Sequence, residues 1–195
     1  MDREKVLNEF RAADALLEGH FILSSGLRSS IYLQCARVMM NPKRGARLCK
    51  ALAAKIAAEV KKPIDLVVAP AMGGVVVGYE MGRQLKVDTI FMERVDGEFQ
   101  LRRGFEIPAG ANVLMMEDVV TTGLSSRECI EAIKAHGGKV VAAASLVDRS
   151  GGKARVGVKL ISLLKLKAPT YEASKLPASL KKIEAIKPGS RGLKA

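Results

Sequence analysis

The chain has 195 residues, with 32 lysines and arginines against 20 aspartates and glutamates, and a formal net charge of +12. One domain of this length can bury a sizeable core, and 48% hydrophobic against 27% charged residues excludes wholesale disorder. Residues 1–150 carry 21 basic and 18 acidic residues, whereas 151–195 carry 11 and 2. Most of the excess charge lies at one end, which argues against nucleic acid as the partner.

Cysteine, histidine and apolar content exclude further classes of protein. Cys35, Cys49 and Cys129 form no CxxC pair and there are two histidines, so we expect no zinc site, no other protein metal site and no disulfide framework. A reducing cytoplasm suits such a chain. The charged start at residues 1–5 is unlike a signal peptide, and the longest uncharged stretch (66–79) is short and interrupted by glycines. We expect no membrane partner.

The N-terminal third predicts two helices and a short strand. Apolar residues recur every three or four positions over 2–18, which predicts an amphipathic helix that ends at Gly19. A polar, turn-forming stretch over 24–30 leads to an extended run at 31–35. The next helix is expected over 42–60, with a proline in its first turn.

From residue 64 onward, short apolar runs alternate with helical stretches. Helices are expected from the Gly73-Gly74 pair to Leu85 and from Ser125 to about residue 136. Strands are expected at 64–69, 88–92, 111–120, 139–147 and 158–166. Continuously apolar strands with crossover helices predict an α/β fold, a doubly wound parallel sheet covered on both faces. In such sheets a ligand binds beyond the carboxyl ends of the strands.

The segment 113–125, Val-Leu-Met-Met-Glu-Asp-Val-Val-Thr-Thr-Gly-Leu-Ser, is the most informative. Buried carboxylates are costly unless partnered, so Glu117 and Asp118 are expected at the end of the strand, facing a cleft. The turn over 121–125 presents N–H groups and hydroxyls at a helix N-terminus, which predicts a phosphate site, and the acids would suit sugar hydroxyls. The alternative is a capped helix with solvated acids, which the position of the acid pair disfavours.

This segment resembles the phosphoribosyl-pyrophosphate (PRPP) motif of type I phosphoribosyltransferases over 13 consecutive positions. Leu124 departs from the motif, where a small residue is usual, and its side chain is expected to point away from the phosphate. The resemblance implies one domain over 1–167, with a small N-terminal hood over about 1–40 and a mobile loop. The PRPP-binding residues it implies are Glu117, Asp118, Val119, Val120, Thr121, Thr122, Gly123, Leu124 and Ser125.

Three further segments resemble the orotate phosphoribosyltransferases: 19–33 (beginning Gly-His-Phe-Ile-Leu-Ser-Ser-Gly), 70–74 (Pro-Ala-Met-Gly-Gly) and 147–152 (Val-Asp-Arg-Ser-Gly-Gly). The resemblance implies transfer of ribose 5-phosphate from PRPP to orotate in pyrimidine synthesis. Arg149 would bind the orotate carboxylate through two parallel hydrogen bonds. Thr121 and Ser25 are the other orotate-binding residues that the resemblance implies.

The loop that would neutralise pyrophosphate departs from the family pattern. Within residues 93–104, Arg94 matches the first loop arginine, but Val95 replaces the lysine that usually follows and the loop has no histidine. We expect Arg94, Arg102 and Arg103 to be the catalytic residues that supply this charge. The alternative is that Arg102 and Arg103 only decorate a solvated hairpin.

The resemblance also implies Mg²⁺, bound mainly through PRPP and pyrophosphate, and a homodimer. The basic C-terminal extension over 168–195 has three prolines and no assigned chemistry, and is expected to be loosely packed. Two alternatives stay open: a purine phosphoribosyltransferase, and a non-catalytic PRPP-binding regulator whose basic tail contacts nucleic acid. Such a regulator would need a helix-turn-helix segment, whereas residues 1–18 predict one helix.

Overall fold

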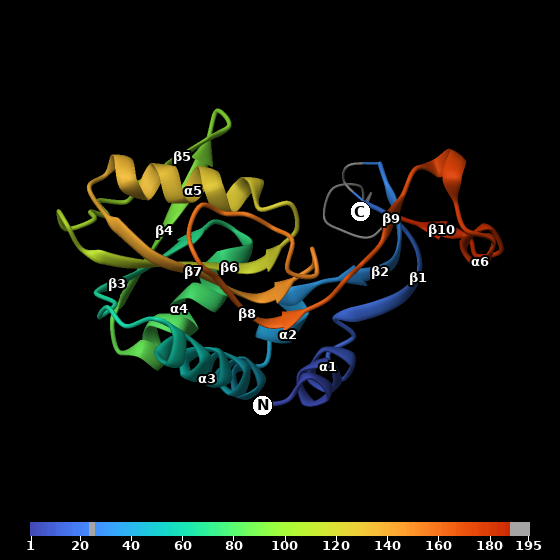
Figure 1. The fold of residues 1–195 in the computed structure, drawn as a ribbon, viewed down its shortest axis with the longest axis horizontal. Helices are drawn as coiled ribbons and strands as arrows, with labels where there is room; N and C mark the ends of the chain where they lie inside the picture. Colours follow the sequence, from blue (N-terminus) through green and yellow to red (C-terminus); the bar gives the residue numbers. More distant parts are fainter. Residues whose placement is uncertain (24–25, 188–195) are drawn as a thin grey trace.

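The computed structural model describes residues 1–23 and 26–187, so Ser25, which was expected to bind orotate, lies outside the described residues. The described helices and strands form two sheets with flanking helices (Figure 1). In chain order they are α1 (Arg3–Arg11), β1 (Leu16–Ile22), β2 (Arg28–Leu33), α2 (Cys35–Met39), α3 (Pro42–Glu59), β3 (Leu66–Pro70), α4 (Gly73–Leu85), β4 (Asp88–Val95), β5 (Glu98–Gln100), β6 (Asn112–Val120), α5 (Leu124–Ala135), β7 (Lys139–Asp148), β8 (Leu160–Lys165), β9 (Thr170–Tyr171), a 3-10 turn (Ala173–Lys175), α6 (Ala178–Lys181) and β10 (Ala185–Ile186).

The larger sheet has six strands in the order β5-β4-β3-β6-β7-β8. All neighbours pair in parallel except β5, which forms an antiparallel hairpin with β4. The predicted parallel α/β core is therefore confirmed. Val120 at the end of β6 lies opposite Asp148 at the end of β7, so the loops that follow these two strands begin side by side.

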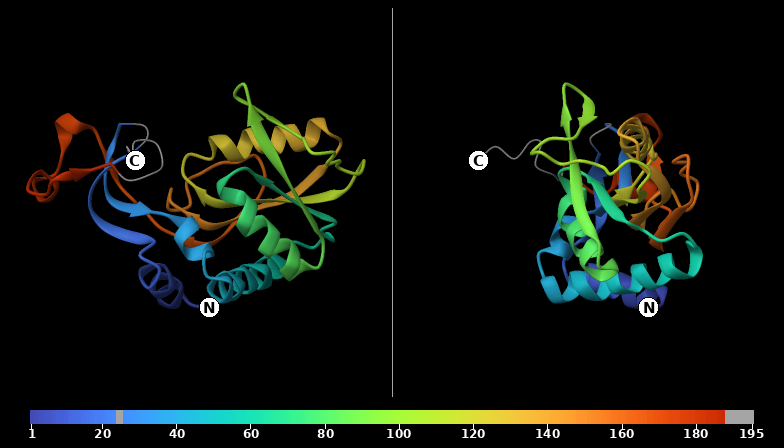
Figure 2. Two further views of the ribbon diagram at one scale, coloured as in Figure 1. Left: turned by 180° about the vertical axis from the view of Figure 1, so that it is seen from behind. Right: turned by 90° about the vertical axis from the view of Figure 1, so that its left-hand side faces the viewer.

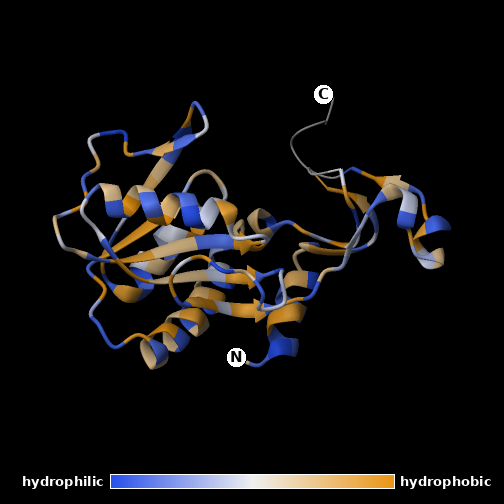
Figure 3. Ribbon diagram, turned by 45° about the horizontal axis from the view of Figure 1, so that its top comes forward, coloured by the Kyte–Doolittle hydropathy of each residue, from blue (hydrophilic) through white to orange (hydrophobic). Residues whose placement is uncertain are grey.

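Helices cover both faces of this sheet, with α3 and α4 on one face and α5 on the other (Figure 1). Residues 113–116 of β6 are fully buried because they pack against helices on both sides. Figure 3 shows the strands mostly in hydrophobic colours, with hydrophilic residues gathered in the loops and on the outer faces of the helices. Across residues 1–23 and 26–187, no helix has both the length and the apolar character needed to cross a membrane.

The predicted N-terminal helix is too long, because α1 ends at Arg11 rather than at residue 18. Asp14 adopts a left-handed φ of +46°, which the helix cannot accommodate, and the chain then enters β1. Leu16 and Leu17 pair with Leu33 and Tyr32 of β2. Leu16 and Leu17 continue the helical spacing of apolar residues in the sequence, but in the structure they belong to a strand.

The second sheet has the order β10-β1-β2-β9, and its outer strands come from the C-terminal tail. β9 pairs with β2, and β10 pairs with β1 (Figure 2). Residues 170–171 and 185–186 are therefore paired with the hood strands, while most residues from 170 to 186 are exposed, in keeping with the expectation of a loosely packed tail. Strands of two residues leave no periodic pattern in the sequence, and these are recruited by the backbone groups at the open edges of β1 and β2. From here on, the hood is this four-stranded sheet, which combines β1 and β2 of the hood expected over about 1–40 with two strands of the tail.

Candidate functional site

The phosphate loop (residues 121–123) lies between the carboxyl end of β6 and the start of α5. Gly123 is the N-cap of α5 with a φ of +79°, and it has no side chain of its own with which to cap the helix. Thr122 Oγ1 accepts a hydrogen bond from the Leu124 N–H (3.3 Å). The first N–H groups of a helix have no partners within it, so this helix end is suited to bind a phosphate. Leu124 is 55% exposed.

Glu117 and Asp118 are consecutive in β6, and their carboxyls are close enough to interact with each other. Glu117 is 8% exposed, and burial together with the charge of Asp118 raises its pKa to about 9. Burial also raises the pKa of Asp118, against the hydrogen bond that its carboxylate accepts from the Val119 N–H (2.8 Å). The raised pKa values favour the protonated form of these carboxyls, and a carboxyl can accept hydrogen bonds from sugar hydroxyls in either form.

A glycine pair brings the start of α4 close to these acids. A Cβ atom at Gly73 would lie 3.0 Å from both carboxylate oxygens of Asp118, and one at Gly74 would lie 3.1 Å from the Met116 carbonyl oxygen. A side chain at Gly73 would therefore occupy the space in front of Asp118. The acid pair identified from the sequence depends on this pair of glycines, whose role the sequence did not show.

Arg149 follows β7 and joins the phosphate-loop strand to the hood. The backbone N–H of Arg149 donates to the Val120 carbonyl (2.8 Å), and the Nη2 atom of its side chain donates to Ser29 Oγ of β2 (3.2 Å). Burial lowers the pKa of its guanidinium. Its Nε atom is buried without a hydrogen-bond partner among the described residues. A buried guanidinium with an unused N–H is suited to an anionic ligand.

Arg127, which the sequence reasoning missed, ties the phosphate loop to the loop after β7. Its Nη1 donates to the carbonyls of Thr122 (3.3 Å) and Arg155 (2.6 Å). Val156 packs there too, since a Cβ atom at Gly123 would lie 2.9 Å from Val156 Cγ1. The two loops are therefore held together by packing and hydrogen bonds. No sequence pattern around residue 127 predicts its contact with Arg155, which is 28 residues away.

The three expected catalytic arginines lie on or beside the β4–β5 hairpin, which protrudes from the body of the domain (Figure 2). Arg94 Nη2 lies 2.6 Å from Glu128 Oε2 on α5. Arg102 and Arg103 both pair with Glu93, at 3.6 and 2.8 Å. Within the described part of the chain, none of them bonds to the phosphate loop or the acid pair. The structure brings together the sites predicted for phosphate, ribose and base, and leaves these arginines outside that cluster.

The three cysteines are buried and free. Burial raises the pKa of Cys49 and of Cys129 to about 12 and that of Cys35 well above its usual value, so none is an activated nucleophile. In the described ranges, no three His, Cys, Asp or Glu side chains gather in a group that could hold a metal ion.

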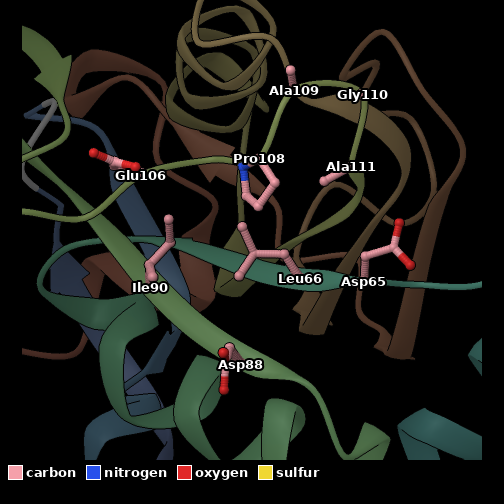
Figure 4. Close-up of a pocket in the computed structure, with 9 residues that line it drawn as sticks. All are labelled: Asp65, Leu66, Asp88, Ile90, Glu106, Pro108, Ala109, Gly110 and Ala111. Atoms are coloured by element: carbon pink, nitrogen blue, oxygen red, sulfur yellow. The ribbon is translucent and has the colours of Figure 1, made fainter.

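A separate pocket of about 440 Å³ lies at the opposite end of the sheet (Figure 4). Leu66 and Asp88, the first residues of β3 and β4, line it together with Asp65 and Glu106. Its acidic lining is unsuited to phosphates, and it lies at the amino ends of the strands. The candidate site is therefore the cluster at the carboxyl ends of β6 and β7.

Known proteins share both the sequence and the fold. Residues 40–175 match the family described as the phosphoribosyl transferase domain. A protein of Parvibaculum lavamentivorans named orotate phosphoribosyltransferase is 62% identical over 191 residues, covering 98% of each chain. One of the same name from Maricaulis maris is 61% identical over 193 residues, covering 99% of this chain and all of the relative.

Among solved structures, orotate phosphoribosyltransferase from Aeropyrum pernix has a TM-score of 0.68 at 27% identity, covering 83% of this chain and 94% of that one. Adenine phosphoribosyltransferase from Thermoanaerobacter pseudethanolicus has a TM-score of 0.59 at 20% identity, covering 70% and 88%, which shows the shared fold alone. The chain therefore belongs to the phosphoribosyltransferase family, with the type I fold, and its full-length relatives are the orotate phosphoribosyltransferases.

Proposed function

We propose that this protein transfers the ribose 5-phosphate group of PRPP to N1 of orotate, which yields orotidine 5'-monophosphate and pyrophosphate for the synthesis of UMP. One observation carries the proposal beyond the similarity of sequence: a buried arginine with an unused N–H, Arg149, follows the strand next to the phosphate loop. A phosphate site beside a carboxylate site is the arrangement that PRPP and orotate require.

The residues of β6 and the phosphate loop would hold PRPP. The N–H groups and hydroxyls of residues 121–125 bind the 5'-phosphate, and Glu117 and Asp118 bind the ribose hydroxyls. The carbon–oxygen bond to pyrophosphate breaks and a bond to orotate N1 forms, through a ribose with oxocarbenium character, and the proton of N1 passes to the departing pyrophosphate or to solvent. No protein nucleophile is needed, so the site acts by holding both substrates in line and excluding water.

Arg149 would recognise orotate through its carboxylate. A planar guanidinium can make two parallel hydrogen bonds to that group, which uracil lacks. Thr121 Oγ1 and Ser25 complete the proposed contacts to the base. Because these groups hold an anionic base, the site differs in chemistry from one for adenine.

The β4–β5 hairpin would supply positive charge to the leaving pyrophosphate. Arg94, Arg102 and Arg103 are the candidates, and the ion pairs of the last two with Glu93 would be exchanged for pyrophosphate oxygens. The hairpin protrudes from its own subunit, so we assign these arginines to the site of a neighbouring subunit.

Magnesium fits the residues present. Asp118 and, once it has lost its proton, Glu117 would offer hard oxygen ligands, but two carboxylates cannot fill an octahedral shell, so the diphosphate and ribose oxygens of PRPP would supply most of it. When bound, the ion neutralises the developing charge on pyrophosphate.

We further propose a homodimer in the cytoplasm. Met72, Val76 and Tyr79, three or four residues apart at the start of α4, are 81%, 54% and 70% exposed and form one apolar face. We propose that a second copy of the chain covers this apolar face, because a dimer would also bring the β4–β5 hairpin of each subunit to the site of the other. Three buried free thiols suit a reducing compartment.

The direct test is to mix the protein with PRPP, Mg²⁺ and orotate and follow the loss of orotate absorbance. We expect loss that depends on both PRPP and Mg²⁺. Turnover with a purine base alone would favour the purine enzyme, and no turnover with any base would favour the regulator. Against the regulator, α1 is followed directly by β1, so residues 1–22 form no helix-turn-helix.

A further inference from the structure

The chain after β8 runs alongside the loop that carries Arg149. The Leu166 N–H donates to the Asp148 carbonyl (2.8 Å), and Lys167 forms an antiparallel bridge with Ser150. A Cβ atom at Gly151 would lie 3.3 Å from that of Lys167. The residues that lead into the C-terminal tail therefore flank Arg149 on one side.

The same segment then enters the hood beside Ser29. Thr170 of β9 lies opposite Ser29 of β2, and the Pro169 carbonyl lies 3.2 Å from Ser29 Oγ. Ser29 is fully buried. Its hydroxyl also lies 2.9 Å from the Ile31 carbonyl, so two carbonyls can accept its proton. The strand and the tail thus each offer the hydroxyl an acceptor, at Ile31 and at Pro169.

Arg149 donates from Nη2 to this hydroxyl oxygen, at 3.2 Å. Because Ser29 gives its proton to a carbonyl, its oxygen presents a lone pair to the guanidinium. A guanidinium is planar, so holding one terminal nitrogen restricts the plane and the direction of the other donors. Nε is the buried donor without a partner among the described residues.

We propose that Ser29 is a positioning residue for the base: backed by the Pro169 carbonyl, it orients the guanidinium of Arg149 toward the carboxylate of orotate. This inference rests on the proposed function. It makes the first residues of the C-terminal tail part of the base site, although they touch no substrate. The tail thereby acts on specificity as well as on the stability of the hood.

The test uses Ser29→Ala and Ser29→Cys in the full-length protein. Alanine removes the hydroxyl, and cysteine keeps a side chain of similar shape but offers a weaker acceptor, so it serves if the alanine variant does not fold. We expect the KM for orotate to rise about fivefold to tenfold in either variant, with the KM for PRPP within about twofold of wild type. Ser30→Ala, one residue along β2 and without a described side-chain hydrogen bond, is the matched control and should keep both values.

A double-mutant cycle separates positioning from structure. Arg149→Lys removes the planar fork, so Ser29→Ala should add less than twofold to the KM for orotate in that background. Equal increases in both KM values, an unchanged KM for orotate, or full additivity with Arg149→Lys would overturn the proposal. If wild type itself does not consume orotate, the proposed function fails; if wild type is active and the cycle is additive, the role of Ser29 alone fails.

Discussion

At the scale of one residue, Glu117 combines a proposed role in PRPP binding with an effect on stability. Its carboxyl is buried at the end of β6 beside Asp118, and its pKa is raised to about 9 from an ordinary 4.5. The folded protein therefore holds a proton on this side chain that the unfolded chain releases above pH 4.5. The contribution of Glu117 to the free energy of unfolding is greatest below that pH and declines as the pH rises toward 9.

Glu117→Gln should consequently stabilise the protein at alkaline pH. Glutamine is neutral throughout, so Tm should exceed that of wild type by about 2–8 °C at pH 8, corresponding to about 1–2 kcal/mol, with a much smaller difference at pH 5. The kcat/KM for PRPP should fall at the same time. Thermal scans of both proteins from pH 5 to 9 check this, and a Tm difference that does not vary with pH would contradict it.

Residues close in sequence could be assigned to the site before the structure was known, but pairs distant in sequence could not. The segment from Glu117 to Ser125 is one strand end and one turn, so its chemistry is local. The contact of Arg149 with Ser29 joins residues 120 apart, and it exists because the hood folds over the ends of β6 and β7. No spacing rule within either segment shows that contact.

At the scale of elements, the turn from β6 to α5 depends on Gly123. Gly123→Ala would place a methyl group at a φ of +79° and 2.9 Å from Val156 Cγ1. We expect a loss of about 1–3 kcal/mol in the free energy of unfolding and an increase of at least about tenfold in the KM for PRPP. Denaturant unfolding and steady-state kinetics measure both.

Gly137→Ala is the matched control for that substitution. Gly137 follows the far end of α5 and also has a left-handed φ, of +86°, but the nearest contact of a Cβ atom there would be Ala109 Cα at 3.8 Å, an ordinary van der Waals distance. It should show the backbone cost alone, with an unchanged KM for PRPP. Equal effects of the two substitutions on that KM would mean that the phosphate loop is not the PRPP site.

The arginines that follow the β4–β5 hairpin allow a direct test of whether positive charge there contributes to kcat. Arg102→Ala and Arg103→Ala, made separately, should lower kcat in at least one case by about 100-fold, since a charge aimed at the leaving group acts mainly in the transition state. Arg3→Ala, which also removes an exposed arginine from an ion pair, should leave kcat unchanged. Near-normal turnover in both hairpin variants would contradict a catalytic role and mean that Arg102 and Arg103 are solvated surface charges.

Element prediction succeeded where burial dictates composition. The expected helix over 42–60 is α3, and the run at 111–120 is β6, because a buried strand or helix needs an uninterrupted apolar pattern. It failed at α1, where a left-handed Asp14 ends the helix, and in the tail. β9 and β10 exist because open strand edges need partners, which is a property of β1 and β2.

For the molecule as a whole, the net charge of +12 has two components. Residues 1–150 are nearly balanced, and the surplus lies in 151–195, part of which pairs with both edges of the hood hairpin. We propose that Arg149 and the arginines beside the β4–β5 hairpin bind the anionic substrates. The lysine-rich tail contributes two backbone strands to the hood, so its structural contribution comes from strand pairing and not from its charge.

The apolar face of α4 predicts the state of assembly. Tyr79→Glu should convert a dimer into a monomer, because burying a carboxylate against Met72 and Val76 of a second copy is costly. Light scattering measures the mass, and turnover should fall with it if hairpins act across the interface. Ile183→Glu, at another exposed apolar position, should remain dimeric. A monomeric wild type would contradict the proposed assembly.

A comparison of bases at saturating PRPP and Mg²⁺ tests most directly whether the site selects an anionic pyrimidine base. Measured with orotate, uracil and adenine, kcat/KM should be highest for orotate, lower for uracil, which lacks the carboxylate, and undetectable for adenine. Equal values for orotate and uracil, or a preference for adenine, would contradict the assignment of Arg149 and with it the account of the site.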